Sequence, residues 1–69
     1  MEQIKLSEEY IKLGQALKAA GLVSSGVEAK IVIQDRLVSV NGEIDTRRGK
    51  KLYGGEVVEF DGQSVKIVK

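Results

Sequence analysis

The dipeptide Asn41–Gly42 constrains the fold of this chain more than any other short segment. It follows residues 37–40, whose pattern is that of a half-buried strand, and it precedes Glu43 and Ile44. Both central residues of a type I′ turn need positive φ, and Asn followed by Gly tolerates this best. The sequence therefore predicts a β-hairpin in the middle of the chain.

Three further strands are predicted from similar signals. Residues 56–60 and 64–68 have the pattern of strands, and Asp61–Gly62 between them indicates a second tight turn. Near the N-terminus, the short alternating segment 3–6 indicates a strand or an extended arm.

A first helix is predicted from about Leu13 to Gly21. Leu13, Ala16, Leu17 and Ala20 recur at helical spacing, and Gly21 suits the left-handed conformation that often ends a helix. Gly14 inside this helix would cost about 1 kcal/mol relative to Ala. We therefore expect Gly14 to lie in the first turn or to allow a close approach of another backbone segment.

A second helix is predicted from Ser25 to about Asp35. Ser25 and Glu28 have the spacing of a capping box, in which the Ser hydroxyl and the Glu carboxylate each accept a hydrogen bond from the other residue's backbone N–H. Lys30 and Gln34 are expected to face outward. The inward face is expected to consist of Ala29, Val32 and Ile33, widened by Val27 and Ile31.

Two helices followed by strands predict an α+β fold, in which two short helices pack on a small antiparallel sheet. A chain of 69 residues without cysteine suits one domain, residues 1–69, with a core built without disulfides. The predicted core comprises Leu13, Leu17, Leu22, Ala29, Val32, Ile33, Val38, Val40, Val58 and Phe60.

Positive charge is concentrated in the middle of the chain. The net charge is only +1, yet residues 12–51 carry eight cations against four carboxylates, a net charge of +4. Four of these cations lie within the five residues "RRGKK", which we expect on a loop closed by Gly54 and Gly55, with Gly49 allowing the backbone to bend. This distribution favours a polyanion as partner.

Composition argues against catalysis. The chain has no His and no Cys, which removes the commonest acid–base group, a common nucleophile and the usual soft metal ligands. No glycine-rich phosphate loop precedes a lysine and a helix. We expect no enzyme activity, no cofactor and no metal, and a cytoplasmic protein without signal peptide or membrane span.

The run "KLGQALKAAGLVSSGVEAKIVIQDRLVSVNGEIDTRRGKKLYGGEVVEF" resembles the S-four domain, or αL RNA-binding motif. The whole chain is most similar to small stand-alone bacterial members, with a family core over about 12–60. The matching positions are Lys12, Leu13, Gly21, Leu22, Ser25, Ala29, Val32, Ile33, Val38, Val40, Asn41, Gly42, Gly55 and Glu56. The resemblance implies that the two helices and the hairpin present a basic face to structured RNA.

Three positions depart from the family pattern: Gly14, Gly26 and Arg36. Many members have an Arg where this chain has Gly26, so one phosphate contact is missing there, and Arg36 is a candidate to replace it. The resemblance implies ribosomal or transfer RNA as partner, on its own or on a ribosomal particle, bound by a monomer. The candidate RNA-binding residues are Lys12, Lys18, Ser25, Lys30, Arg36, Arg47, Arg48, Lys50 and Lys51.

Two alternatives stay open from the sequence. The same cations could be solvated or dock an acidic protein instead of RNA. Tyr53, beside the cationic run, could stack on a base or pack at the rim of the core, whereas Tyr10 is expected to pack.

Overall fold

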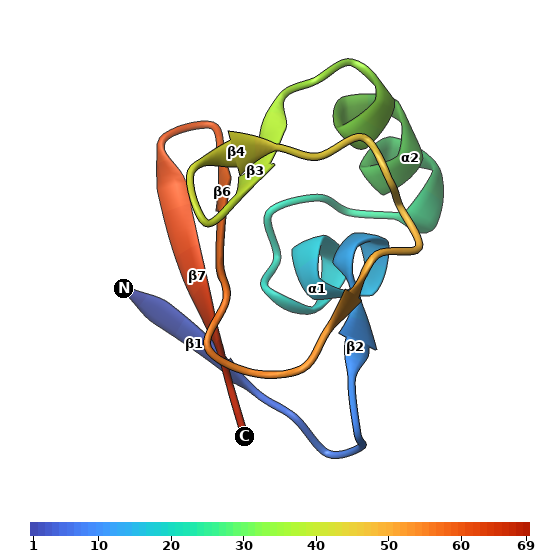
Figure 1. Ribbon diagram of the computed structural model, residues 1–69. Coiled ribbons are helices and arrows are strands. Elements are labelled where there is room, and N and C mark those ends of the chain that lie inside the picture. The colour runs from blue at the N-terminus through green and yellow to red at the C-terminus, as the bar shows by residue number, and fades with distance from the viewer.

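The computed structural model describes all 69 residues and confirms the α+β class (Figure 1). Two helices, α1 (Leu13–Ala19) and α2 (Gly26–Gln34), lie beside a five-stranded sheet with the order β1-β7-β6-β3-β4. A separate two-stranded ribbon pairs β2 (Ile11–Lys12) with β5 (Lys51–Leu52). The strands of the larger sheet are β1 (Glu2–Lys5), β3 (Val38–Val40), β4 (Glu43–Ile44), β6 (Val57–Phe60) and β7 (Gln63–Val68).

The larger sheet is mixed, so the expectation of a purely antiparallel sheet was wrong. β1 pairs in parallel with β7, with Glu2 opposite Val65 and Lys5 opposite Val68. These strands come from the two ends of the chain, and the intervening residues supply the long connection that parallel pairing needs. All other pairs in this sheet are antiparallel.

Both tight turns form as predicted. Asn41 and Gly42 have φ of 53° and 85°, and Asp61 and Gly62 have φ of 54° and 75°. Asn41 also ties its hairpin to β6, because its side-chain oxygen accepts from the backbone N–H of Val57 at 2.9 Å. The turn chemistry therefore fixes the register of the three central strands.

The helix ends follow the predicted pattern with one correction. Gly21 has a φ of 74° just beyond α1, and the Ser25 hydroxyl accepts from the Glu28 N–H at 3.1 Å at the start of α2. The Glu28 carboxylate, however, accepts from the N–H and hydroxyl of Ser24, at 2.8 and 2.9 Å, and not from Ser25. The Ser24 N–H donation is the main cause that lowers the pKa of Glu28. Neither helix has the length and apolar character needed to cross a membrane.

The core lies between the helices and the sheet. Of the ten predicted core residues, Leu22 and Phe60 are only half-buried against it, and the other eight belong to the buried cluster. The prediction that Val27 and Ile31 face inward was wrong, because both are exposed. Each lies two residues from Ala29 or Ile33, which turns it to the opposite side of α2. The cluster also contains Ala16, Val23, Leu52 and Ile67.

Candidate nucleic-acid interface

The β2–β5 ribbon is the first element of the candidate site, and the sequence did not predict it. Ile11 lies opposite Leu52, and Lys12 lies directly opposite Lys51. Leu52 is fully buried while Lys51 is exposed, so the ribbon turns its two lysines outward. Lys51 is therefore held on a strand and not on the expected loop.

The segment between β4 and β5, residues 45–50, is hydrogen-bonded to the start of α1, and we call it the cationic segment. The first N–H groups of a helix have no partner within the helix and need one elsewhere. Here the Leu13 N–H donates to the carbonyl of Lys50 at 2.8 Å, and the Gly14 N–H donates to the carbonyl of Arg48 at 3.0 Å. The cationic segment is thus fixed against the helix by its own backbone.

Gly14 was expected to lie in the first turn or to allow a close backbone approach, and its position in the first turn is confirmed. It lies in the first turn of α1, and a Cβ placed on it would come within 2.8 Å of Cγ of Arg48. No Cβ tolerates such a separation, so a larger residue would displace Arg48. The glycine at this position therefore leaves room for the side chain of Arg48 against the helix, while the Arg48 carbonyl would lie at an ordinary 3.6 Å from a Cβ.

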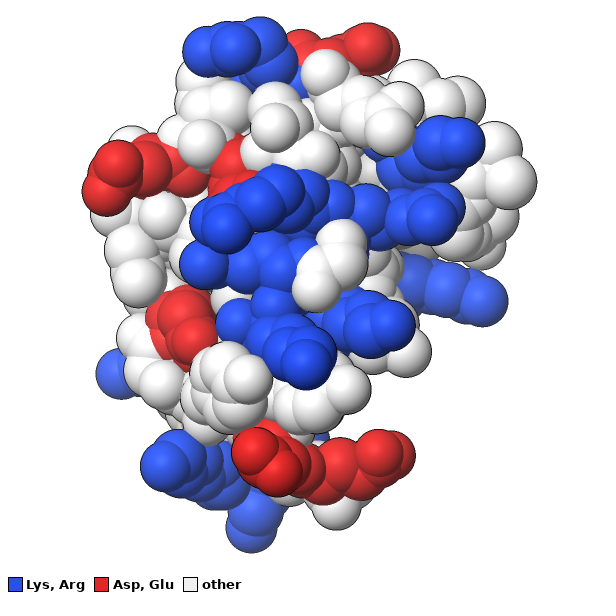
Figure 2. All heavy atoms as spheres, turned by 45° about the vertical axis from the view of Figure 1, so that its right-hand side comes forward, with Lys and Arg blue, Asp and Glu red and all other residues white.

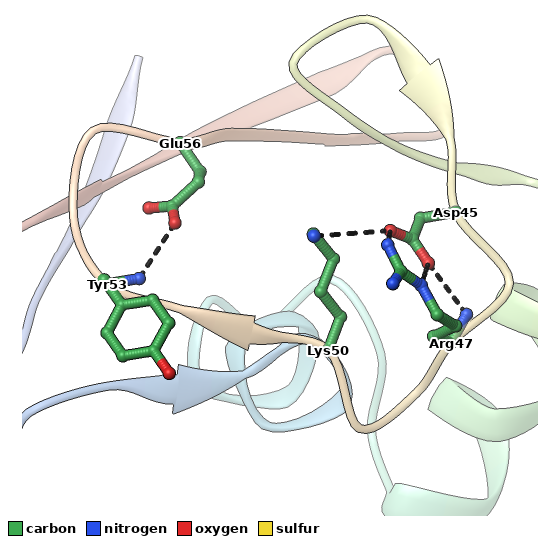
Figure 3. A network of polar contacts seen from close by, with 5 residues as sticks. All are labelled: Asp45, Arg47, Lys50, Tyr53 and Glu56. Carbon is green, nitrogen blue, oxygen red and sulfur yellow. Dashed lines mark hydrogen bonds and ion pairs between the residues drawn. The ribbon is translucent and has the colours of Figure 1, made fainter.

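Asp45 holds two of the four clustered cations (Figure 3). Its buried carboxylate accepts from Nε and Nη2 of Arg47 at 3.1 and 2.9 Å and from the Arg47 backbone N–H at 2.9 Å. Nζ of Lys50 lies 4.0 Å from the same carboxylate. The hydrogen bonds from the Arg47 side chain are the main reason why the pKa of Asp45 is lowered. Arg47 and Lys50 are therefore partly neutralised.

Three other cations line a hollow of about 350 Å³ between α1, the first turn of α2 and the cationic segment. They are Lys12, Lys18 and Arg48, and no carboxylate lines the hollow. Both salt bridges of the molecule use Asp45, so none of these three is ion-paired. The lining residues are Lys12, Gly14, Gln15, Lys18, Gly26, Ala29, Arg48 and Gly49.

The space-filling view shows the result. Lys and Arg side chains form one patch across the middle of this face, and acidic side chains lie toward its margins (Figure 2). We call the unpaired cations Lys12, Lys18, Arg48 and Lys51 the basic face. It combines residues that are up to 39 positions apart in the sequence.

The remaining candidate residues have different surroundings. Lys30 and Arg36 are exposed on α2 and just after it, and neither lines the hollow. Arg36 has a φ of 65°, which is a strained conformation for a residue with a Cβ. The Ser25 hydroxyl accepts from the Glu28 N–H and so acts as the cap of α2.

The role expected for Gly49 was wrong. The chain bends at residues 47–50, where the Lys50 N–H donates to the Arg47 carbonyl at 3.1 Å. Gly49 does not have a positive φ, and a Cβ on it would meet no atom within 4 Å. Residues with side chains can adopt this turn, so the bend does not depend on glycine.

Glu56 fixes the far end of β5, again through backbone donors (Figure 3). Its carboxylate accepts from the N–H groups of Tyr53 and Gly54, both at 2.8 Å. Burial is the largest single influence and opposes ionisation of Glu56, but the N–H groups of Tyr53, Gly54 and Glu56 itself, together with the charge of Lys50, outweigh it, so the pKa of Glu56 is lowered. Neither this carboxylate nor any other belongs to a group of three or more that could hold a metal ion.

Tyr10 was expected only to pack, and its position beside the cations was missed. In the structure its ring lies beside that of Tyr53, with centroids 5.8 Å apart, and Nζ of Lys51 lies 4.9 Å from its centroid. The missed signal was the segment 10–12, which repeats the order aromatic, apolar, lysine in reverse of 51–53.

These features define a small α+β domain with Lys and Arg side chains over α1 and the ribbon. Known proteins are similar to it in sequence and in fold. The profile of the family described as S4 domain matches residues 4–68. The chain belongs to this family, as the sequence resemblance indicated.

Individual relatives are similar over most of their length. RlbA of Bacillus subtilis (strain 168), named "Probable ribosome maturation protein", is 49% identical over 59 residues, which are 86% of this chain and 83% of RlbA. YbcJ of Escherichia coli (strain K12) is 39% identical over 59 residues, 86% of this chain and 84% of YbcJ. The solution structure of YbcJ is described as revealing an αL motif involved in RNA-binding. It superimposes on the structure of this chain with a TM-score of 0.76 and a sequence identity of 36%. The superposition covers 100% of this chain and 89% of YbcJ.

Proposed function

We propose that this protein binds structured RNA through the basic face, without catalysing a reaction. The observation that carries the proposal is the direct pairing of Lys12 with Lys51 across the ribbon. Like charges directly opposite each other destabilise an antiparallel pair. A bound phosphate placed between them would remove that repulsion.

The other members of the basic face extend the same chemistry. Lys18 and Arg48 are unpaired and line the same hollow as Lys12. Arginine can grip a phosphate with two hydrogen bonds, and lysine contributes a point charge. Recognition of this kind reads phosphates and backbone shape more than base sequence.

The RNA is proposed to be ribosomal or transfer RNA, bound either as free RNA or as part of a ribosomal particle. The description of YbcJ supports RNA binding in general, and the name of RlbA supports a role connected with ribosome maturation. Cross-linking the protein to RNA in cells and sequencing the bound RNA would test this choice. Recovery of messenger RNA without ribosomal or transfer RNA would contradict it.

Salt dependence tests the binding mode. If the basic face makes about four phosphate contacts with a largely single-stranded site, log affinity should fall with log salt at a slope of about −2.8. Affinity would then weaken about 50-fold between about 50 and 200 mM salt. Fluorescence anisotropy with a labelled RNA hairpin measures this slope.

A set of matched variants assigns the contacts. Changing Arg47, Arg48, Lys50 and Lys51 to Gln should reduce the affinity and flatten the slope by up to about one unit for each phosphate that is no longer bound. Changing Lys12 and Lys51 together should act more strongly than changing Lys5 and Lys66, which remove the same charge from the five-stranded sheet. Absence of RNA binding at low salt, together with a stable acidic protein partner, would favour protein docking instead.

A further inference from the structure

Two tyrosines flank the β2–β5 ribbon, Tyr10 just before β2 and Tyr53 just after β5. The register that pairs Ile11 with Leu52 places Tyr10 opposite Tyr53 when it is continued by one residue. The ring centroids are 5.8 Å apart and the rings are tilted by 54°, the geometry of a favourable aromatic pair. The ribbon thus presents a lysine pair followed by a tyrosine pair.

Tyr53 is the exposed member of the tyrosine pair. It is 45% exposed, whereas Tyr10 and Phe60, the other aromatic residues of the chain, are half-buried. Tyr10 is covered by Nζ of Lys51, 4.9 Å from its centroid, which is within range of a cation–π contact. Tyr10 supports the Tyr53 ring from one side, and much of the Tyr53 ring still faces solvent.

The position of Tyr53 is fixed before any ligand binds. Its backbone N–H and that of Gly54 both donate to the Glu56 carboxylate at 2.8 Å. Its side chain points away from that carboxylate (Figure 3). A tyrosine has only two side-chain torsions, so stacking on a ring already held in place costs little conformational entropy.

We propose that Tyr53, supported by Tyr10, stacks on one unpaired nucleobase of the RNA that the basic face binds. Residues two apart on a strand lie about 6.6 Å from each other on the same face. Tyr53 follows β5 directly, two residues after Lys51, so one nucleotide can place its phosphate near the lysine pair and its base on the ring. The inference rests on the proposed function and adds the kind of nucleotide that the site selects.

The consequence is a preference for unpaired nucleotides beside a helix. Bases inside an A-form duplex are stacked on one another and do not expose their faces, whereas bases in loops and bulges do. Every base has a flat face, so stacking of this type does not depend on sequence. The surface would then distinguish a loop from a continuous duplex without reading a sequence.

Two fluorescein-labelled RNAs test the proposal by anisotropy: a hairpin with a loop of unpaired nucleotides and a blunt duplex of equal charge. Tyr53→Leu should weaken binding to the hairpin about 5- to 100-fold and leave duplex binding unchanged. Tyr53→Phe should keep the wild-type affinity because its ring still stacks. The salt slope should stay the same in both variants, because no phosphate contact is removed.

Tyrosine fluorescence provides a second readout, since the chain has two tyrosines and no tryptophan. Tyr10→Phe leaves Tyr53 as the only tyrosine. Its fluorescence should be quenched by the unlabelled hairpin and remain unchanged with the duplex.

Different outcomes overturn the inference and the proposed function. Wild-type affinity of Tyr53→Leu for the hairpin overturns the stacking site while leaving RNA binding in place. If Tyr53→Leu weakened binding to the hairpin and to the duplex equally and also lowered the melting temperature of the protein, Tyr53 would have a structural role. This outcome would also overturn the stacking site. Failure of the wild type to bind either RNA at low salt overturns the proposed function itself.

Discussion

The five-stranded sheet and the β2–β5 ribbon use their cross-strand pairs in opposite ways. In the sheet, several pairs join two apolar residues, as with Val58 opposite Val40 and Ile4 opposite Ile67. Its charged residues face neutral ones, and no like charges lie directly opposite each other. In the ribbon, one of the two pairs is Lys12 with Lys51.

The ribbon tolerates this repulsion because other contacts hold it in place. Leu52 is fully buried, and the carbonyls of Lys50 and Arg48 accept from the first N–H groups of α1. The sheet therefore supplies stability while the ribbon presents charge. Substitutions in the two regions should have separable effects.

The largest expected effect comes from the core of the sheet. Ile67 on β7 is fully buried, and Ile67→Ala should cost about 2–5 kcal/mol in the free energy of unfolding. A domain of this size has little stability to lose, so this variant should be partly or wholly unfolded. Urea denaturation followed by circular dichroism measures the loss. The exposed neighbour Lys66→Gln is the control, with a change within about 0.5 kcal/mol. Equal midpoints for the two variants would mean that β7 does not anchor the core.

The next effect concerns Asp45, which connects the sheet to the cationic segment. Asp45→Asn removes one carboxylate oxygen from Arg47 and Lys50 and should cost about 1–3 kcal/mol, measured by thermal melting. The pKa of Asp45 is lowered in the folded state, so its contribution to stability is full well above its ordinary value of 3.8 and is lost as the pH falls below it.

The melting temperature measured at acid pH provides a second test of the role of Asp45. The melting temperature of Asp45→Asn should fall less than that of the wild type between about pH 5 and pH 2. Glu28 and Glu56 also have lowered pKa values, so some pH dependence should remain in the variant. Parallel profiles for the two proteins would contradict the role of Asp45.

A smaller effect of opposite sign is expected in the ribbon. Lys12→Gln removes a like-charge pair and should stabilise the free protein by a few tenths of a kcal/mol at low salt. Lys51→Gln removes the same pair but also loses the cation–π contact with Tyr10, so it should gain less. The gain should shrink as salt screens the repulsion. The same substitutions should weaken RNA binding and lower its salt slope by up to about one unit. Chemical denaturation at two salt concentrations checks the stability, and Lys66→Gln serves as the charge-matched control. A variant that is stabilised but binds RNA with the wild-type affinity would show that the lysine pair is not part of the RNA-binding site.

The smallest effect on RNA binding is expected at Arg36, outside both regions. Arg36→Gly relieves a φ of 65° but increases the entropy of the unfolded chain, so stability should rise by less than about 1 kcal/mol. Arg36→Gln removes the charge and keeps the backbone strain. RNA affinity should fall less in Arg36→Gln than in Lys12→Gln, because Arg36 does not line the hollow. A larger loss would show that Arg36 supplies the contact missing at Gly26.

Features that depend only on neighbouring residues could be predicted from the sequence. The Asn41–Gly42 and Asp61–Gly62 turns, the Ser25 cap and the Gly21 helix end formed where they were predicted. Each follows from the φ preference or hydrogen bonding of a few adjacent residues. The S4 family pattern consists of the same local signals, which is why the sequence alone was enough to recognise it.

Features that depend on residues far apart in the chain follow only from the tertiary structure. No local rule pairs Ile11–Lys12 with Lys51–Leu52, or Glu2–Lys5 with the last strand. Asp45 and Arg47 are close in sequence, but their ion pair matters because tertiary packing buries the Asp45 carboxylate. Because this carboxylate pairs with Arg47 and Lys50, only two of the four clustered cations stay unpaired. Charge density could be read from the composition of residues 47–51. Long-range contacts decide which cations remain unpaired and able to bind a phosphate, and they place two of these opposite each other beside a tyrosine pair. Such contacts have a high cost in chain entropy, which only the complete core offsets.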